Sequence, residues 1–439
     1  MSRRLLLICY FYPPLAGGGV HRALGFTRHL PGHGWDCTVL CAGPEDYWVR
    51  DETLVGRIPP ATEVIRVSGG SALAAWLRLR RGDPGRRSGR VFGGLRALSD
   101  WWLLPDSYAG WARRARRAAA RRIARGGVDA VLSSSPPDSA HLAALDLPPA
   151  GPPARRARLP WVADFRDPWV GLRFRTPPTA WHAARQRALE RRVLRGADLV
   201  LAASRTHADD LEGDPEARPR RVLHLPNGYE PDAAPPAPAP RDGEHFTLVF
   251  TGTLSLMPDT EVLLEALHEL LARRPEARRR VRARLAGPYD RDYEDRAEAL
   301  GLTGIVTFTG PLAHGDARAL QRAADVLLLW KPRGYRTMVP GKVYEYLDAG
   351  VPVVALLEPE DEAGRLVGRA GGTLLPPGDR ETLAAEIERR YLAWKEGARP
   401  GAPRPGWLEE HTRSRLAARL AAALDDLAAR PAGPAEGTP

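Results

Sequence analysis

Short, continuously apolar segments alternate along the chain with longer stretches in which apolar residues recur at a helical period. Unalternating apolar segments are typical of buried parallel strands, and amphipathic stretches between them are typical of helices that cover the sheet. The first series of expected strands is Leu5–Tyr10, Cys37–Cys41, Ala130–Ser133, Trp161–Ala163, Leu199–Ala202 and Val222–Leu225. The second is Thr247–Phe250, Arg282–Ala286, Val306–Thr309, Val326–Leu329 and Val353–Leu356. Two such series predict two doubly wound α/β domains.

A proline-rich stretch separates the two series and predicts an extended connector, because proline joins neither a helix interior nor a central strand. Helices are expected between the strands, for example at Ala109–Arg125, Thr179–Arg195, Thr260–Arg273 and His314–Ala323. The expected organisation is an N-terminal Rossmann-like domain over residues 1–230, a linker over 231–242 and a C-terminal Rossmann-like domain over 243–406. A final helix over 407–430 and a disordered tail over 431–439 complete it.

Composition narrows the class of protein only partly. The chain has 64 Lys and Arg against 53 Asp and Glu, a net charge of +11 carried mostly by arginine. Such a balance fits nucleic acid, an anionic membrane surface or phosphorylated substrates, but an arginine- and alanine-rich proteome produces it as well. Three cysteines without a CxxC motif predict a reducing cytoplasm and neither disulfides nor structural zinc. The apolar start, Met1–Ile8, fits a first buried strand better than a signal peptide.

Two loops of the N-terminal half carry candidate chemistry. Gly17–Gly19 follow the first strand, where glycines let a backbone approach a ligand; a tight turn is the alternative. Asp164, Arg166 and Asp167 follow a later strand and offer hydrogen bonds to sugar hydroxyls or a base for an acceptor hydroxyl. The alternative is an Asp–Arg pair that fixes the loop over Trp169. His141 is a candidate on the acceptor side, with a structural role as its alternative.

In the C-terminal half, several glycine turns follow strands on the same side of the expected sheet. Gly252 and Thr253 end one strand and Gly287 ends the next, so a diphosphate could be seated there. Further along, Pro340 and Gly350 bracket a short helix that carries Lys342 and Glu345 on one face. A lysine at this place can reach phosphate and a carboxylate can bind two ribose hydroxyls, whereas a surface Lys–Glu pair is the alternative.

Together these motifs resemble the retaining glycosyltransferases of family 4, which have the GT-B fold. The pattern is carried by Pro13-Pro14 with Gly17–Gly19, Asp164–Trp169, Pro226-Asn227-Gly228, Thr251-Gly252, and Pro340-Gly341-Lys342 with Glu345-Tyr346-Leu347, and it covers nearly the whole chain. The resemblance implies two Rossmann-like domains that face each other across a cleft, and sugar transfer from a nucleotide-diphosphate sugar to an acceptor hydroxyl. It implies retention without a metal or other cofactor, with the leaving phosphate taking the acceptor proton.

The resemblance also assigns roles to residues. Glu345 is expected to bind the nucleotide ribose, and Lys342 and Gly341 to lie near the diphosphate or sugar, joined by Gly252, Thr253 and Gly287. Gly18 and Gly19 would approach the donor, and Asp164, Arg166 and Asp167 would face the acceptor. Thr337 stands where the family often has a second glutamate, and no cation follows Thr253 where the family often has two. Compensating sugar or diphosphate contacts are expected from Lys331, Arg333, Arg336, Thr337 or Met338.

The expected function is therefore a cytoplasmic glycosyltransferase of surface glycan or glycolipid biosynthesis, with a glycan or lipid-linked acceptor and no nucleic-acid partner. Arginines fill most of the segment Ala112–Arg125 outside an apolar stripe and recur between Arg78 and Arg87, so peripheral attachment to the inner face of the plasma membrane is a further expectation. A solvated helix is its alternative.

Asp290-Arg291-Asp292 resembles a metal-binding DxD motif, but we interpret its acids as those of a first helical turn. A nucleotide-sugar epimerase or sugar phosphorylase of the same architecture, and a non-catalytic basic module, remain alternatives.

Overall fold

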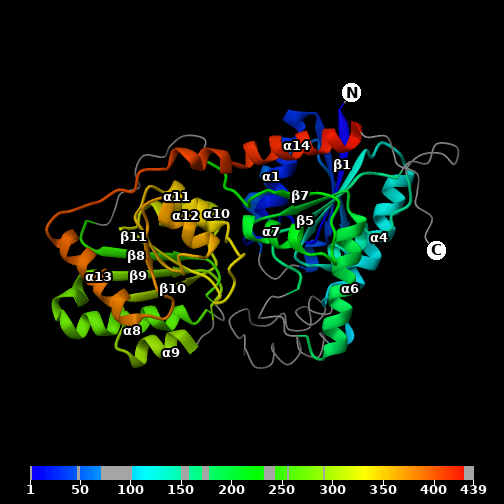
Figure 1. Cartoon of the computed structure of the whole chain (residues 1–439). Helices are drawn as coiled ribbons and strands as arrows, with labels where there is room; N and C mark the ends of the chain where they lie inside the picture. Colours follow the sequence, from blue (N-terminus) through cyan, green and yellow to red (C-terminus); the bar gives the residue numbers. More distant parts are fainter. Residues whose placement is uncertain are drawn as a thin grey trace. The chain divides into compact units, whose positions relative to one another are not determined.

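A computed structural model describes residues 2–46, 50–70, 101–149, 158–170, 177–231, 243–254, 257–289 and 292–429 (Figure 1). The expected linker after Pro231, the expected tail, the arginines between Arg78 and Arg87, and Asp290 and Arg291 lie outside these residues. The described chain forms two compact units. The first unit contains the chain up to Gly228 and again from Arg413, and the second contains Tyr229–Thr412. Across these ranges no helix is long and apolar enough to cross a membrane.

The first unit is built on a seven-stranded parallel sheet in the order β3-β2-β1-β4-β5-β6-β7. Its strands are β1 (Arg3–Cys9), β2 (Trp35–Ala42), β3 (Glu63–Val67), β4 (Ala130–Ser135), β5 (Trp161–Phe165), β6 (Leu199–Ala202) and β7 (Val222–His224). The helices are α1 (His21–His29), α4 (Ala109–Ala124), α5 (Ser139–Ala144), α6 (Ala180–Gly196), α7 (Arg205–Gly213) and α14 (Arg413–Ala429). Because successive strand residues point to opposite faces, Leu6 and Ile8 join the core that contains α4 and α5, while Leu5 and Leu7 join the core that contains α1 and α14.

The last helix completes this unit although it is the most distant part of the sequence. The chain forms a 3₁₀ helix at Gly406–His411 and begins α14 only at Arg413, so the single helix expected from residue 407 is interrupted. Leu416, Leu420 and Leu424 of α14 are buried against the sheet. Gly25 of α1 leaves the room for this contact, because a Cβ there would lie 2.6 Å from the Arg413 side chain.

The second unit holds a six-stranded parallel sheet in the order β10-β9-β8-β11-β12-β13 (Figure 1). Its strands are β8 (Phe246–Thr251), β9 (Val281–Ala286), β10 (Val306–Gly310), β11 (Val326–Trp330), β12 (Val353–Leu356) and β13 (Thr373–Leu375). Its helices are α8 (Asp259–Arg273), α9 (Asp292–Ala299), α10 (His314–Arg322), α11 (Lys342–Asp348), α12 (Glu362–Arg369) and α13 (Arg380–Lys395). One core joins the sheet to α8 and α13, and the other joins it to α11 and α12.

In both units the strand order reverses beside the first strand, between β1 and β4 and between β8 and β11. Ligands of doubly wound sheets bind outside the carboxyl ends of the strands at this switch point. The residues after β1 and β4, and those after β8 and β11, are therefore the places to look for a site in each unit.

Candidate functional site

Two glycine turns lie against each other at the carboxyl ends of β8 and β9. Gly252 has φ +137° and Gly287 has φ +141°, a backbone conformation that favours glycine, and the amide of Gly252 donates to the carbonyl of Ala286 at 2.8 Å. A Cβ on Gly287 would lie 1.8 Å from the carbonyl oxygen of Gly252. The absence of a side chain on Gly287 is thus a requirement of the backbone packing here. Gly287 is buried, and Gly252 is half-buried at the edge of the sheet.

Lys342 reaches this pair of turns from the first turn of α11. Its Nζ lies 3.6 Å from the centroid of the Phe250 ring and 3.0 Å from the position that a Cβ on Gly252 would take. Burial lowers the pKa of Lys342 to about 7, and the nearby Glu345 opposes the shift. Within the described residues, neither the Lys342 ammonium nor the Glu345 carboxylate has a hydrogen bond or an ion pair. The Phe250 ring and the charge of Glu345 stabilise the ammonium without a hydrogen bond, so an anion could bind it without displacing a hydrogen-bond partner.

A buried polar network under α11 fixes this arrangement. Arg318 of α10 donates to the carbonyl of Glu345 at 2.6 Å and to the carboxylate of Asp348 at 2.5 Å. The hydroxyl of Tyr346 accepts the amide of Thr251 at 2.7 Å, which ties α11 to the last residue of β8. Removing one member would leave buried polar groups without partners, so the network holds Lys342 and Glu345 in place beside Gly252.

Sequence reasoning missed this network. Gln321 completes it by donating to the Thr251 hydroxyl at 2.8 Å. The available signal was the position of Arg318 and Gln321, three apart on α10, whose side chains are buried although both are polar. Periodicity alone assigns such residues to the solvent side, because their partners lie on other elements.

Lys331, Arg333 and Arg336 were expected to replace the two cations that are missing after Thr253. The structure shows that they differ in whether they are already paired. Lys331 is buried and pairs with Asp361 at 3.2 Å, and it also donates to the carbonyls of Tyr335 and Met338. Its donors therefore anchor the loop after β11, and this geometry does not fit the expected contact with a diphosphate. Arg333 is likewise engaged, with Asp259 at 2.5 Å.

Arg336 fits the expected contact better. Its side chain is exposed, and Thr337 and Met338 beside it are half-buried. Thr253 is exposed after the Gly252 turn, and Gly341 has open space around the position of a Cβ. These residues of the second unit stay available to a ligand, whereas Lys331 does not.

In the first unit, Asp164 is completely buried and fully engaged. It receives two hydrogen bonds from Arg22, at 3.0 and 2.7 Å, and a third from the Ser134 hydroxyl at 2.8 Å. Arg22 also donates to the carbonyl of Pro226. Asp164 therefore does not fit the expected role of a base that faces an acceptor. Its contacts fit the alternative, an Asp–Arg pair that fixes the loop. The partner of Asp164 in this pair is Arg22 of α1 and not Arg166.

Arg166 binds backbone rather than an acidic side chain. It donates to the carbonyls of Ser135 at 2.6 Å, Pro136 at 2.9 Å and Gly19 at 2.5 Å, so one guanidinium joins the residues after β1 to those after β4. Desolvation lowers its pKa, and Asp164 and Asp167 oppose the shift. The side chain thus positions both loops of the switch point. Asp167 is half-buried beside it.

Gly18 and Gly19, in the loop that Arg166 contacts, differ in how much space surrounds them. Gly18 is exposed with open space around its Cβ position, whereas a Cβ on Gly19 would lie 3.2 Å from the Phe11 ring and 3.5 Å from Arg166. A side chain at Gly19 would therefore be in tight contact with the Phe11 ring, which would have to shift slightly. Gly18, like Gly17 before it, is therefore accessible in this loop.

His141 lies away from any surface. It is fully buried, its Nδ1 lies 2.8 Å from the Ser133 hydroxyl, and its ring stacks on Phe165 with 4.4 Å between centroids. Desolvation lowers its pKa to about 3, so the imidazole is neutral at physiological pH. The expected place on the acceptor side is wrong for this side chain, and its structural alternative holds.

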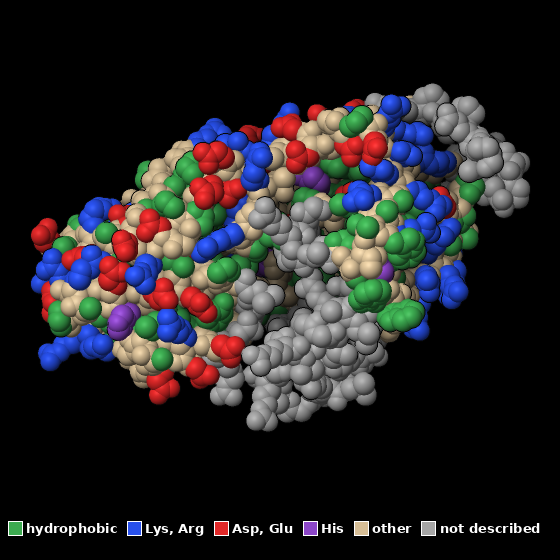
Figure 2. All heavy atoms as spheres, turned by 60° about the horizontal axis from the view of Figure 1, so that its bottom comes forward, with side chains coloured by type: hydrophobic (Ala, Val, Ile, Leu, Met, Phe, Trp, Pro, Cys, Tyr) green, Lys and Arg blue, Asp and Glu red, His purple; other side chains and the backbone are tan. Residues whose placement is uncertain are grey.

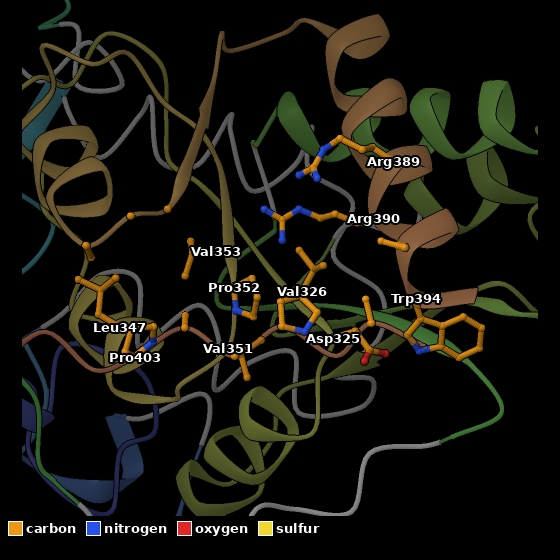
Figure 3. A pocket seen from close by; sticks show the side chains of 18 of the residues that line it. Asp325, Val326, Leu347, Val351, Pro352, Val353, Arg389, Arg390, Trp394 and Pro403 are labelled. Atoms are coloured by element: carbon orange, nitrogen blue, oxygen red, sulfur yellow. The ribbon is translucent and has the colours of Figure 1, made fainter. Parts of the chain in front are cut away.

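A hollow of about 450 Å³ opens at the other edge of the second sheet (Figure 3). It is lined by Phe246, Val326 and Val353, which begin β8, β11 and β12, and by Arg390 and Trp394 of α13. The glycine turns and Lys342 are not part of its lining. The hollow is therefore separate from the carboxyl edge where the candidate donor residues lie.

Comparison with known proteins agrees with this architecture. Residues 17–228 match the family described as "Glycosyl transferase 4-like domain", and residues 245–392 match "Glycosyl transferases group 1". A curated relative, D-inositol 3-phosphate glycosyltransferase of Geodermatophilus obscurus, is 30% identical over 260 residues, which is 55% of this chain and 56% of that protein. The chain thus spans about half the length of this relative.

Solved structures share the fold across the whole chain. A glycosyltransferase from Rickettsia africae has a TM-score of 0.59 at 13% identity, covering 98% of this chain and 99% of that one. Anabaena HepE, solved in complex with UDP-glucose, has a TM-score of 0.53 at 15% identity, covering 98% and 97%. These neighbours establish two parallel-sheet α/β domains of the GT-B type, as the sequence predicted. The chain therefore has a domain that matches the glycosyl transferase 4-like family, followed by a domain that matches the group 1 glycosyl transferases.

Proposed function

We propose that the protein transfers a sugar from a nucleotide-diphosphate sugar to an acceptor hydroxyl, with retention and without a metal or other cofactor. In this reaction the bond between the sugar C1 and the diphosphate oxygen breaks and a bond from C1 to the acceptor oxygen forms. The acceptor proton passes to the leaving phosphate. The chain then has to bind and orient the two substrates and to stabilise the departing charge, which are the terms that dominate such catalysis.

The observation that carries this proposal is the pair formed by Lys342 and Glu345 beside the Gly252 turn. Both side chains are free of protein partners among the described residues, and a buried network fixes both. The ammonium would neutralise the departing diphosphate, and the carboxylate would accept hydrogen bonds from two hydroxyls of the ribose. The Gly252 turn would lie beside the phosphates, because the Lys342 ammonium lies against it, 3.0 Å from the position that a Cβ on Gly252 would take.

The roles proposed for the first unit follow from the resemblance and from the place of its two loops, after β1 and after β5. Gly18 would approach the donor, and Asp167 and the remaining donors of Arg166 would meet the acceptor. Asp164 acts by positioning, through Arg22. We further propose a glycan or lipid-linked acceptor in surface glycan or glycolipid biosynthesis, on the cytoplasmic side of a membrane. UDP-glucose is the first donor to test, because the similarly folded HepE was solved with it.

The test begins with a panel of nucleoside diphosphates and their sugars scored by the rise in melting temperature, since a ligand that binds the folded state stabilises it by mass action. Glu345→Ala should then weaken the best donor by ~1.5–3 kcal/mol, the scale of a hydrogen bond to a charged group. Glu360→Ala, an exposed carboxylate of the same unit, is the matched control. An unchanged affinity for Glu345→Ala would refute the ribose assignment. Release of an isomer of the donor sugar, with no acceptor present, would refute transfer and indicate an epimerase.

A further inference from the structure

Three tryptophan side chains of the first unit are exposed to solvent. Trp101 is 53% exposed, Trp102 is 81% exposed and Trp181 is 63% exposed. Tryptophan has a large apolar surface that is normally covered, so several exposed indoles near one another mark a place where the protein contacts something else. None of these residues belongs to the candidate donor site or to the loops that Arg166 holds.

Contacts with His182 bring Trp101 and Trp181 together, and Trp102 follows Trp101 in the chain. The Trp101 ring lies 5.3 Å from the His182 ring, and the Trp181 ring lies 4.9 Å from it, both edge to face. The ring nitrogen Nε2 of His182 lies 3.2 Å from the carbonyl of Trp101, and Gln186 donates to the carbonyl of Pro105 at 2.7 Å. The residues from Trp101 to Pro105 therefore run along the first turns of α6, and His182 and Gln186 fix them there.

The helix that presents this cluster is basic on its outer face. His182 and Gln186 point inward, and the next residue on that side, Glu190, is half-buried and accepts the amide of Val170 at 3.2 Å. Desolvation raises the pKa of Glu190 to about 7, so the one carboxylate of α6 adds little negative charge. Trp181 and Arg185, one turn apart, are exposed together with Arg187, and neither arginine has a partner among the described residues.

Helix α4 extends the same surface. It has six arginines and no acidic residue, and its buried stripe contains Ala112, Ala115, Ala119 and Ile123. Arg116 of α4 donates to the carbonyl of Asp146 at 3.0 Å, and Arg192 of α6 pairs with the carboxylate of the same residue. The two arginine-rich helices thus flank Asp146. Figure 2 shows exposed hydrophobic side chains next to a group of basic side chains on the right of the view.

We propose that Trp101, Trp102 and Trp181, with the exposed arginines of α4 and α6, form a surface that docks on an anionic phospholipid bilayer. Indole rings partition to the boundary between headgroups and acyl chains, and arginines beside them pair with anionic headgroups. The tryptophans insert and the arginines remain in the headgroup layer. A nucleic acid would satisfy the arginines as well, but tryptophans on a helix end outside any strand platform are poorly placed for base stacking.

This inference does not depend on the proposed donor site, and the two can fail separately. The full-length chain is sedimented with vesicles of phosphatidylcholine alone and with vesicles that contain phosphatidylglycerol, at low and at high salt. We expect binding to the anionic vesicles only, weakened at high salt because surface charges are screened. Failure to bind anionic vesicles at low salt would overturn the proposal, whatever the affinity for nucleotides.

Two double variants separate the contribution of tryptophan insertion to vesicle binding from that of the arginine charges. The double variant Trp102→Ser, Trp181→Ser should lower the apparent partition coefficient by on the order of tenfold or more. The double variant Arg185→Gln, Arg187→Gln should lower it by roughly tenfold and reduce the salt dependence. Arg279→Gln, Arg284→Gln removes the same charge from exposed positions of the second unit and should bind as the wild type does. Melting temperature and nucleotide binding, measured in parallel, should be unchanged in all three.

Each remaining outcome is decisive. If both test variants bind like the wild type, the surface is not the docking site and the proposal is wrong. If the control loses as much binding as Arg185→Gln, Arg187→Gln, attraction is due to net charge alone and the proposal is also wrong. If a single-stranded RNA binds tightly while anionic vesicles do not, the surface is a nucleic-acid site instead.

Discussion

Replacing Lys342 with methionine should stabilise the protein and impair donor binding at the same time. The pKa of this lysine falls from 10.5 to about 7, and 3.5 units at 1.36 kcal/mol each amount to roughly 5 kcal/mol against the charged amine. The unfolded chain has no such penalty. Methionine keeps the apolar stem and packs against the Phe250 ring, while the lost cation–π contact takes back about 1–2 kcal/mol. The net gain is about 3–4 kcal/mol, or roughly 6–16 °C in the melting temperature of the second unit.

The same change removes the cation that we assign to the diphosphate. Affinity for the best nucleotide-diphosphate sugar should fall by about 1.5–3 kcal/mol, which is 10- to 150-fold. Because an anion favours the protonated amine, the wild type should take up roughly half a proton per ligand at pH 7. Its affinity should therefore weaken as the pH rises above 7. Lys342→Arg, which stays charged, should lose this pH dependence.

Calorimetry in two buffers of different ionisation enthalpy measures the proton uptake, and thermal denaturation measures the stability. A sugar-linked diphosphate has no phosphate proton to lose near neutral pH, so any uptake comes from the protein. If Lys342→Met has the melting temperature of the wild type and also its affinity for the nucleotide-diphosphate sugar, both the burial cost and the diphosphate contact inferred for Lys342 are refuted. Proton uptake near zero at pH 7–8 in the wild type would refute the assignment of Lys342 alone.

Three further predictions follow from the buried groups. Gly287→Ala should destabilise the second unit by ~3 kcal/mol or more, because its Cβ meets the carbonyl of Gly252 at 1.8 Å, whereas Gly341→Ala, with open space, should leave the melting temperature unchanged. Asp164→Asn should cost about 3–5 kcal/mol by leaving its buried arginine partner uncompensated; a normal melting temperature with lost activity would point to catalysis instead. His141 and His207, with pKa values lowered to about 3 and about 4, bind fewer protons folded than unfolded below pH 6.5, so stability is lost as the pH falls. At pH 5 each should have lost about 2 kcal/mol, and denaturation of His207→Gln should show a shallower decline.

The central strands could be predicted from the sequence because they are buried on both faces. Continuous apolar runs mark β1, β8 and β11 without ambiguity, and each lies within a residue or two of the expected range. The strands that escaped prediction, β3 and β13, are edge strands of their sheets. All five residues of β3 are only half-buried, and β13 has three residues. The edge strands β7 and β10 were expected from short apolar runs, but an edge strand that is half-buried throughout or only three residues long needs no such run, so β3 and β13 were missed.

The candidate donor residues were predictable for a different reason. Lys342, Glu345 and Gly252 lie in short local motifs whose chemistry requires a given residue type at a given place. Each motif could be recognised from adjacent residues, although the contact of Lys342 with the Gly252 turn joins two distant elements. The buried pair of Arg22 with Asp164 and that of Arg318 with Asp348 join residues 142 and 30 positions apart. The partner of a buried charge over such a distance is set by the tertiary packing. The sequence could therefore indicate Asp164 and a loop-fixing Asp–Arg pair as one of its roles, but it could not identify Arg22 as the partner.

Arginine illustrates the limit of composition as evidence. Arg22 and Arg166 are desolvated and bind a carboxylate or backbone carbonyls, so they hold the loops at the switch point of the first sheet. Arg185 and Arg187 are exposed beside Trp181 and have no partner in the described chain. In the net charge of +11 all four count equally. Salt separates them physically, because buried pairs are screened little and exposed charges strongly. The excess of positive charge therefore indicates a binding partner only after the buried arginines are left out of the count. In this chain, the exposed arginines beside the exposed tryptophans favour a membrane surface.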